Sequence, residues 1–210
     1  GFVFYQRPND DEILFLSGTW VKIDLNSKPT LNGFIISNAD KSASFYLEGK
    51  AKFILSAFEL NLESSSPKQQ ETTKKKYLSK AELFINACKK DISKVVLSRI
   101  KKHPVIDENI FQTYLNLCED YNHSFNYLCN IPNEGTWMGA TPEILIEGST
   151  ENYTTVSLAG SKALDNINWK KKELEEQQFV TNYIKEKLES ESINHQFNSP
   201  PETVKAGNIA

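Results

Sequence analysis

Short apolar runs follow one another along the first 62 residues with no helical stretch between them. The runs at 2–5 (FVFY), 33–37 (GFIIS) and 44–48 (SFYLE) are bounded by Asn, Asp, Gly and Pro, which are typical of turns. Strands that neighbour each other in sequence pair antiparallel, because parallel strands need a long crossover connection. This pattern favours an α+β fold, with antiparallel sheets flanked by helices, over a doubly wound parallel sheet.

Helices and further strands alternate along the rest of the chain. Ser79 and Glu82 form a capping-box pattern, and apolar residues repeat behind them at helical spacing up to Cys88. The other expected elements are a strand at 94–100, a helix near 107–121, strands at 124–131, 143–148 and 153–160, and a helix from about 169 to 188.

One stretch, residues 63–76, contains no hydrophobic residue and predicts a flexible surface loop. It divides a variable, β-rich portion (1–62) from a portion that carries the polar motifs (77–210). We expect residues 1–210 to be the N-terminal part of one catalytic domain.

Charge and cysteine content exclude several classes of partner. The chain of 210 residues has a formal net charge of −3 and no basic face, which argues against nucleic acid. No apolar run is long enough to cross a membrane. The three cysteines lack metal-binding spacing, so we expect buried thiols in a reducing cytoplasm, and three scattered histidines argue against zinc.

Lys94 and Glu143 are polar residues at the starts of apolar runs. Lys94 is either a solvated strand end or a base at the rim of a cleft. Glu143 follows Pro142, and shielding by Trp137 and Met138 would favour its protonated form, as in a general acid. An ordinary exposed edge carboxylate is the alternative for Glu143.

Two further stretches are compatible with anion and cation binding. The run Ala159-Gly160-Ser161 at a strand end can present backbone N–H groups and a hydroxyl to an anion, although most such turns are only turns. Glu173 and Glu176 lie three apart on one helix face and can offer two carboxylates to Mg²⁺, although a solvated charged face is the commoner case.

Taken in order, KVVLSR (94–99), GATPE (139–143), LAGS (158–161) and KELEEQ (172–177) resemble the motifs of the chorismate-binding enzymes. That family includes the isochorismate, salicylate, anthranilate and aminodeoxychorismate synthases. The resemblance covers about residues 77–210, ending in AGNIA, and implies the chorismate-utilising fold of anthranilate synthase component I in truncated form.

The resemblance implies a role for each motif residue. Lys94 corresponds to the base that activates water for attack on C2 of chorismate, and ammonia-using members lack this lysine. Glu143 corresponds to the general acid that protonates the departing C4 hydroxyl. Where aminodeoxychorismate synthases carry a nucleophilic lysine, this chain has Ala159. Covalent catalysis is therefore not expected.

The resemblance also implies a magnesium site and contacts with the substrate carboxylate. Glu176 corresponds to a Mg²⁺ ligand, and Glu173 is placed to hold a metal-bound water. Gly160 and Ser161 would contact the same end of chorismate. The chain departs from the family at Gln177, where histidine is usual. The family's second metal glutamate, its carboxylate-binding arginine and its glycine-rich loop are absent from these 210 residues.

The expected function is that of a Mg²⁺-dependent isochorismate synthase, an isomerase of menaquinone or siderophore synthesis, acting as a cytoplasmic monomer on chorismate. The alternatives are a salicylate synthase and a catalytically inactive chorismate-fold module; anthranilate synthase is disfavoured by Lys94. The 210-residue piece alone is expected to be inactive and a poor folder, with exposed strand edges and apolar faces that bind a surface dye.

Overall fold

A computed structural model describes residues 1–24, 32–38, 40–53, 70–90, 92–104, 109–149, 151–164 and 168–204. The chain divides into two compact units. The first unit combines Gly1–Pro67 with Asp107–Pro142, and the second combines Lys68–Ile106 with Glu143–Ala210. Each unit is described by itself. That all 210 residues belong to one catalytic domain stays a prediction.

A five-stranded antiparallel sheet is the centre of the first unit. Its strand order is β6 (Lys52–Phe53), β2 (Ile13–Ser17), β1 (Phe2–Gln6), β7 (Phe125–Ile131), β8 (Gly135–Thr141). In the middle strand, Phe4 lies opposite Phe15 on one side and Leu128 on the other. The first strand of the chain is thus paired with a strand that begins more than a hundred residues later.

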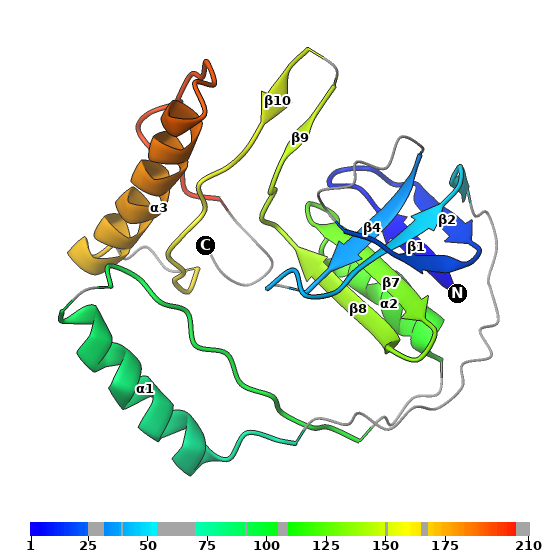
Figure 1. Ribbon diagram of the computed structural model, residues 1–210, viewed down its shortest axis with the longest axis horizontal. Helices are drawn as coiled ribbons and strands as arrows, with labels where there is room; N and C mark the ends of the chain where they lie inside the picture. The colour runs from blue at the N-terminus through cyan, green and yellow to red at the C-terminus, as the bar shows by residue number, and fades with distance from the viewer. Residues whose placement is uncertain are drawn as a thin grey trace. The chain divides into compact units, whose positions relative to one another are not determined.

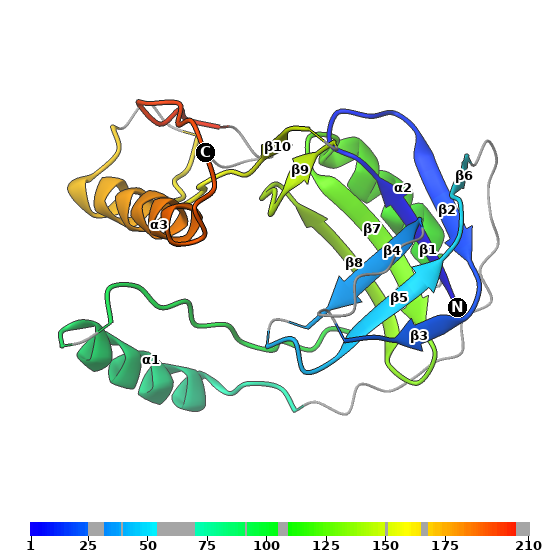
Figure 2. The ribbon, with the colours of Figure 1, turned by 45° about the horizontal axis from the view of Figure 1, so that its top comes forward.

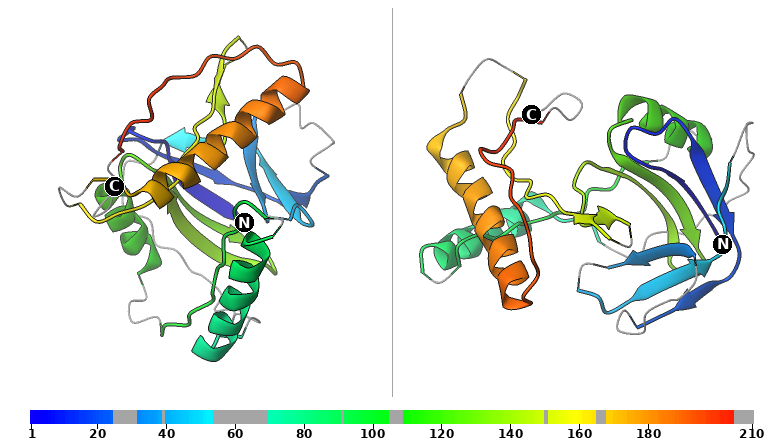
Figure 3. Two further views of the ribbon diagram at one scale, coloured as in Figure 1. Left: turned by 90° about the vertical axis from the view of Figure 1, so that its left-hand side faces the viewer. Right: turned by 90° about the horizontal axis from the view of Figure 1, so that it is seen from above.

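A second sheet and one helix cover the two faces of this main sheet (Figure 2, and Figure 3, right). The second sheet has the antiparallel order β3 (Trp20–Lys22), β5 (Ser44–Glu48), β4 (Gly33–Ser37). The helix is α2 (Ile110–Asp120), whose N-cap Asn109 accepts a hydrogen bond from the Gln112 amide. The first unit is therefore built in three layers.

Two apolar clusters fill the spaces between these layers. One joins the two sheets and consists of Val3, Leu16, Leu47, Cys129 and Ile131. The other joins the main sheet to α2 and consists of Phe4, Phe111, Tyr114, Cys118 and Leu128. Successive residues of a strand point to opposite faces, so β1 contributes Val3 to one cluster and Phe4 to the other.

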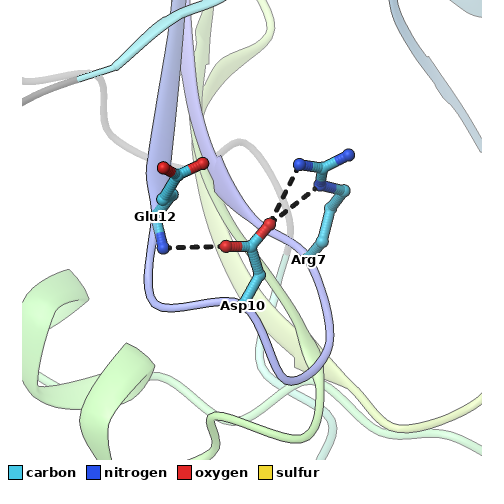
Figure 4. A network of polar contacts seen from close by, with 3 residues as sticks. All are labelled: Arg7, Asp10 and Glu12. Atoms are coloured by element: carbon cyan, nitrogen blue, oxygen red, sulfur yellow. Dashed lines mark hydrogen bonds and ion pairs between the residues drawn. The ribbon is translucent and has the colours of Figure 1, made fainter.

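The turn between β1 and β2 is fixed by one carboxylate (Figure 4). Asp10 accepts a hydrogen bond from the backbone N–H of Glu12 at 3.0 Å and pairs with the Arg7 guanidinium at 2.9 Å. Asn9 adopts a left-handed backbone with φ of 57°, which asparagine tolerates better than most residues. These contacts reverse the chain so that β1 and β2 pair in register.

The second unit contains α1 (Lys74–Cys88), the two-stranded antiparallel sheet of β9 (Glu147–Gly148) and β10 (Tyr153–Thr154), and α3 (Lys171–Ser190) (Figure 1). Neither α1 nor α3 contains a buried residue. Among the residues that the structure describes, all those of the buried apolar core lie in the first unit.

The structure confirms the coarse prediction of antiparallel sheets combined with a few helices. It also bears out the strands near 2–5, 33–37, 44–48 and 124–131 and the helices α2 and α3. No described helix has the length and apolar character needed to cross a membrane.

The predicted start of the first long helix was wrong. Helix α1 begins at Lys74, because the hydroxyl of Thr73, and not that of Ser79, accepts the capping hydrogen bond, from the Lys76 amide at 3.3 Å. Residues 74–76 of the predicted loop are therefore helical. Residues up to 69 of that loop, like the AGNIA segment, lie outside the described residues. The predicted buried face of α1 is also wrong, since Ile85 and Cys88 are exposed.

Three predicted strands are absent or much shorter. Residues 94–100 belong to no strand in the described part of the chain. The strand expected at 143–148 is reduced to Glu147–Gly148, and the one at 153–160 to Tyr153–Thr154. Apolar alternation predicts a strand only where a partner strand is available for its backbone groups.

The three thiols are predicted to differ sharply in reactivity. Burial raises the pKa of Cys129 from 9.0 to about 12 and also raises the pKa of Cys118, so at pH 8 both stay protonated, whereas Cys88 is exposed. With a disulfide reagent at pH 8, we expect one thiol to react at once and two only after denaturant is added. Mass spectrometry of the labelled peptides identifies them. Prompt labelling of Cys118 or Cys129 would contradict the packing of the first unit.

Candidate functional site

Helix α3 carries one face on which polar side chains are partly buried. Glu176 and Gln177 follow Glu173 by three and four residues, and Thr181 follows Gln177 by four, so all four lie along one side of the helix. Glu173 is in the first turn, where the helix dipole favours a negative charge. The second unit therefore places two carboxylates, an amide and a hydroxyl in a row.

Lys94 lies beside this row. Its Nζ is 3.1 Å from Oε1 of Glu176, and the two side chains are only 28% and 31% exposed. The other carboxylate oxygen of Glu176 lies 3.9 Å from Nζ of Lys172, an exposed residue one turn earlier in the helix. The sequence suggested Lys94 and Glu176 separately, and the structure brings them into direct contact.

The segment that follows β10 runs alongside α3 (Figure 1, yellow beside orange). The hydroxyls of Ser157 and Thr181 are 2.8 Å apart, and Gln177 Nε2 donates to both. The predicted substrate-binding residues 159–161 come directly after this contact. The segment is thus attached to the face of α3 that carries the glutamates.

Gly160 lies beside the start of α3. Its φ of +83° is a left-handed conformation that strongly favours glycine. A Cβ at this position would lie 3.5 Å from the Glu173 Cβ and 3.5 Å from the Trp169 ring. Backbone conformation, and not lack of space, is what requires glycine here. Ala159 is partly buried and Ser161 is exposed.

The carboxylate of Glu173 has an unusual environment. Its Oε2 is buried and has no hydrogen-bond partner among the residues that the structure describes. A buried carboxylate oxygen without a partner is unfavourable, and a hard cation would satisfy it. Among the described residues, no group of three or more His, Cys, Asp or Glu side chains gathers in one place. Glu173 and Glu176 therefore fit a cation as two of its ligands, with further oxygen atoms needed to complete the coordination.

Glu143 lies between β8 and β9 and is exposed. It opens no apolar strand, contrary to the sequence-based expectation. The expected desolvation of its carboxyl group is wrong, since Glu143 is exposed. Its role as a general acid stays a prediction.

Sequence reasoning missed three residues that shape this site: Ser157, Thr181 and Trp169. Thr181 follows Gln177 by four residues, a spacing that already predicts contact on a helix. Trp169 packs against Gly160, donates from Nε1 to the Thr203 hydroxyl at 2.8 Å and has the Lys162 ammonium 5.0 Å from its ring centroid. No local pattern indicated the role of Trp169.

Comparison with known proteins agrees with the motifs. The model of a family described as "Chorismate binding enzyme" matches residues 30–210. A search of curated proteins finds no match. The matched range includes Lys94, Glu143, the 159–161 segment and α3.

Replacing Gly160 by alanine is predicted to loosen the segment on α3. A non-glycine residue in the left-handed region destabilises the closed segment by about 1 kcal/mol or more. That is enough to raise the equilibrium constant for local opening roughly fivefold. We expect faster hydrogen exchange of the backbone amides at 157–163 in Gly160→Ala, measured by mass spectrometry. Ser161→Ala, one residue on, is the control and is expected to exchange like the parent. Equal exchange in all three proteins would contradict the strained geometry at Gly160.

Proposed function

The chain belongs to the chorismate-binding enzyme family, and on that basis we propose that it acts as an isochorismate synthase. The reaction adds water at C2 of chorismate and expels the hydroxyl at C4, so that the hydroxyl group changes position without net gain or loss of atoms. The single observation that carries the proposal is Lys94, held beside the glutamate face of α3.

Lys94 supports water as the nucleophile. By the family resemblance, members that add water carry a lysine here, and members that add ammonia lack it. The contact with Glu176 restrains the long lysine side chain, so the Lys94 Nζ occupies a defined position beside α3. To act as a base, Lys94 would have to leave this ion pair and lose its proton, and the neutral amine would then take a proton from the water that attacks C2.

Glu143 and Ala159 complete the proposed assignment. Glu143 would give a proton to the departing C4 hydroxyl. Its exposure leaves it accessible to substrate, and bound chorismate would exclude the surrounding water. Ala159 has no nucleophilic atom, which favours direct addition over a covalent intermediate.

Mg²⁺ is the proposed cofactor. Glu173, whose buried Oε2 has no partner in the described part of the chain, and Glu176 are the residues that would hold it. When bound, the ion would neutralise and orient the C1 carboxylate of chorismate. The neighbouring backbone of Gly160 and the Ser161 hydroxyl would contact the same end of the substrate.

Two alternatives share part of this argument. A salicylate synthase would use the same lysine and then eliminate pyruvate. A catalytically inactive chorismate-fold module would retain the binding surface alone. Product analysis separates all three, because isochorismate, salicylate with pyruvate, and unchanged chorismate are distinct compounds.

We expect the full-length protein, given chorismate and Mg²⁺, to form isochorismate, and Lys94→Met to lower kcat at least a hundredfold through loss of the base. Chromatography of the products measures both. Lys171→Met is the matched control, because this exposed lysine pairs with Glu175 at the outer side of α3. Similar losses in the two variants would indicate a general charge effect and would contradict the base role.

Removing the cation is expected to abolish turnover, and added Mg²⁺ to restore it. Glu173→Gln should raise the Mg²⁺ concentration for half-maximal rate about tenfold or more, because the buried oxygen loses its charge. Glu175→Gln, an exposed neighbour on the same helix, should leave that concentration unchanged. Full activity in excess chelator would eliminate the proposed cofactor.

A further inference from the structure

We propose that Gln177 is a positioning residue whose side-chain amide, together with Ser157 and Thr181, forms a clasp that fixes the 159–161 segment on α3. The inference rests on the proposed function, because it is this segment that would contact chorismate. It assigns a role to the position where the chain departs from the histidine usual in its family.

The clasp is a closed set of hydrogen bonds between two parts of the chain. Gln177 Nε2 donates to Thr181 Oγ1 at 2.9 Å, to Ser157 Oγ at 3.2 Å and to the Ser157 carbonyl oxygen at 3.4 Å. The two hydroxyls complete the triangle at 2.8 Å. All three side chains are partly buried, so water competes with these bonds only in part.

The chemistry of the three groups fixes the orientation of the amide. The Ser157 carbonyl oxygen can only accept, so the nitrogen of the Gln177 amide, and not its oxygen, must face it. The hydroxyls then accept from the same nitrogen, and one of them donates to the other. A side chain without an N–H donor cannot reproduce this arrangement.

The clasp lies close enough to residues 159–161 to determine their position relative to α3. Ser157 is held by Gln177 and Thr181, and Gly160 packs against Glu173 and Trp169. Only two residues separate Ser157 from Gly160, and both contact α3, so the helix determines the position of the backbone between them. Releasing Ser157 would let residues 159–161 move relative to the glutamates of α3.

The adjacent residue of the same helix provides a matched comparison. Gln178 Nε2 donates to Asn182 Oδ1 at 2.7 Å, so the two glutamines share residue type and i,i+4 spacing. Gln178 is exposed and this hydrogen bond stays within the helix, whereas Gln177 also bonds to Ser157, twenty residues away in the sequence. Gln178→Met therefore controls for the loss of a helical glutamine.

The test compares the full-length protein with its Gln177→Met and Gln178→Met variants. Hydrogen exchange of the amides at 158–161, without substrate, reports on the clasp, and KM and kcat for chorismate report on positioning. We expect Gln177→Met to raise both the exchange rate and KM about tenfold, the effect of one or two lost hydrogen bonds, with kcat within about threefold. Gln178→Met should change neither.

Unchanged exchange in Gln177→Met overturns the clasp. Raised exchange with unchanged KM, or a fall in kcat alone, overturns the positioning role. If the parent neither converts nor binds chorismate, the proposed function fails separately, and exchange alone then decides whether Gln177 holds the segment.

Discussion

The first unit depends on the double burial of β1. Val3 and Phe4 are neighbours in this strand, point to opposite faces and are both fully buried. One face supports the second sheet and the other supports α2, so a single strand is shared by two apolar clusters. Burying each such side chain contributes about 1.5–3 kcal/mol, and neither layer could be removed without exposing β1.

The second unit is held together differently. In the described residues its helices bury no side chain completely, and its recorded long-range contacts include Lys94 with Glu176, Ser157 with Thr181 and Trp169 with Thr203. Each partly exposed polar contact contributes only about 1 kcal/mol or less. Geometry at the candidate site is therefore set by several weak contacts acting on one helix, and not by a packed core.

The sequence predicted those helices and strands whose formation depends on residues that are close together in the chain. The alternation in β7, the apolar face of α2 and the helical spacing of Glu173, Glu176 and Gln177 were all visible in the sequence. The start of α1 was misplaced because two hydroxyl residues could cap it. The strand at 94–100 failed because a strand requires a partner, which no local pattern supplies. The contact between Lys94 and α3 depends on chain reversal over a long interval, so it could not be derived from either motif alone.

The pairing of Phe2 with Asn130 also constrains how the chain can be made. While the ribosome is still synthesising α1, the edge of β1 that pairs with β7 lacks that partner strand. The central sheet closes when β7 emerges from the exit tunnel. Val3 and Phe4 therefore complete their packing, against Cys129 and Leu128 respectively, only after β7 has joined the sheet.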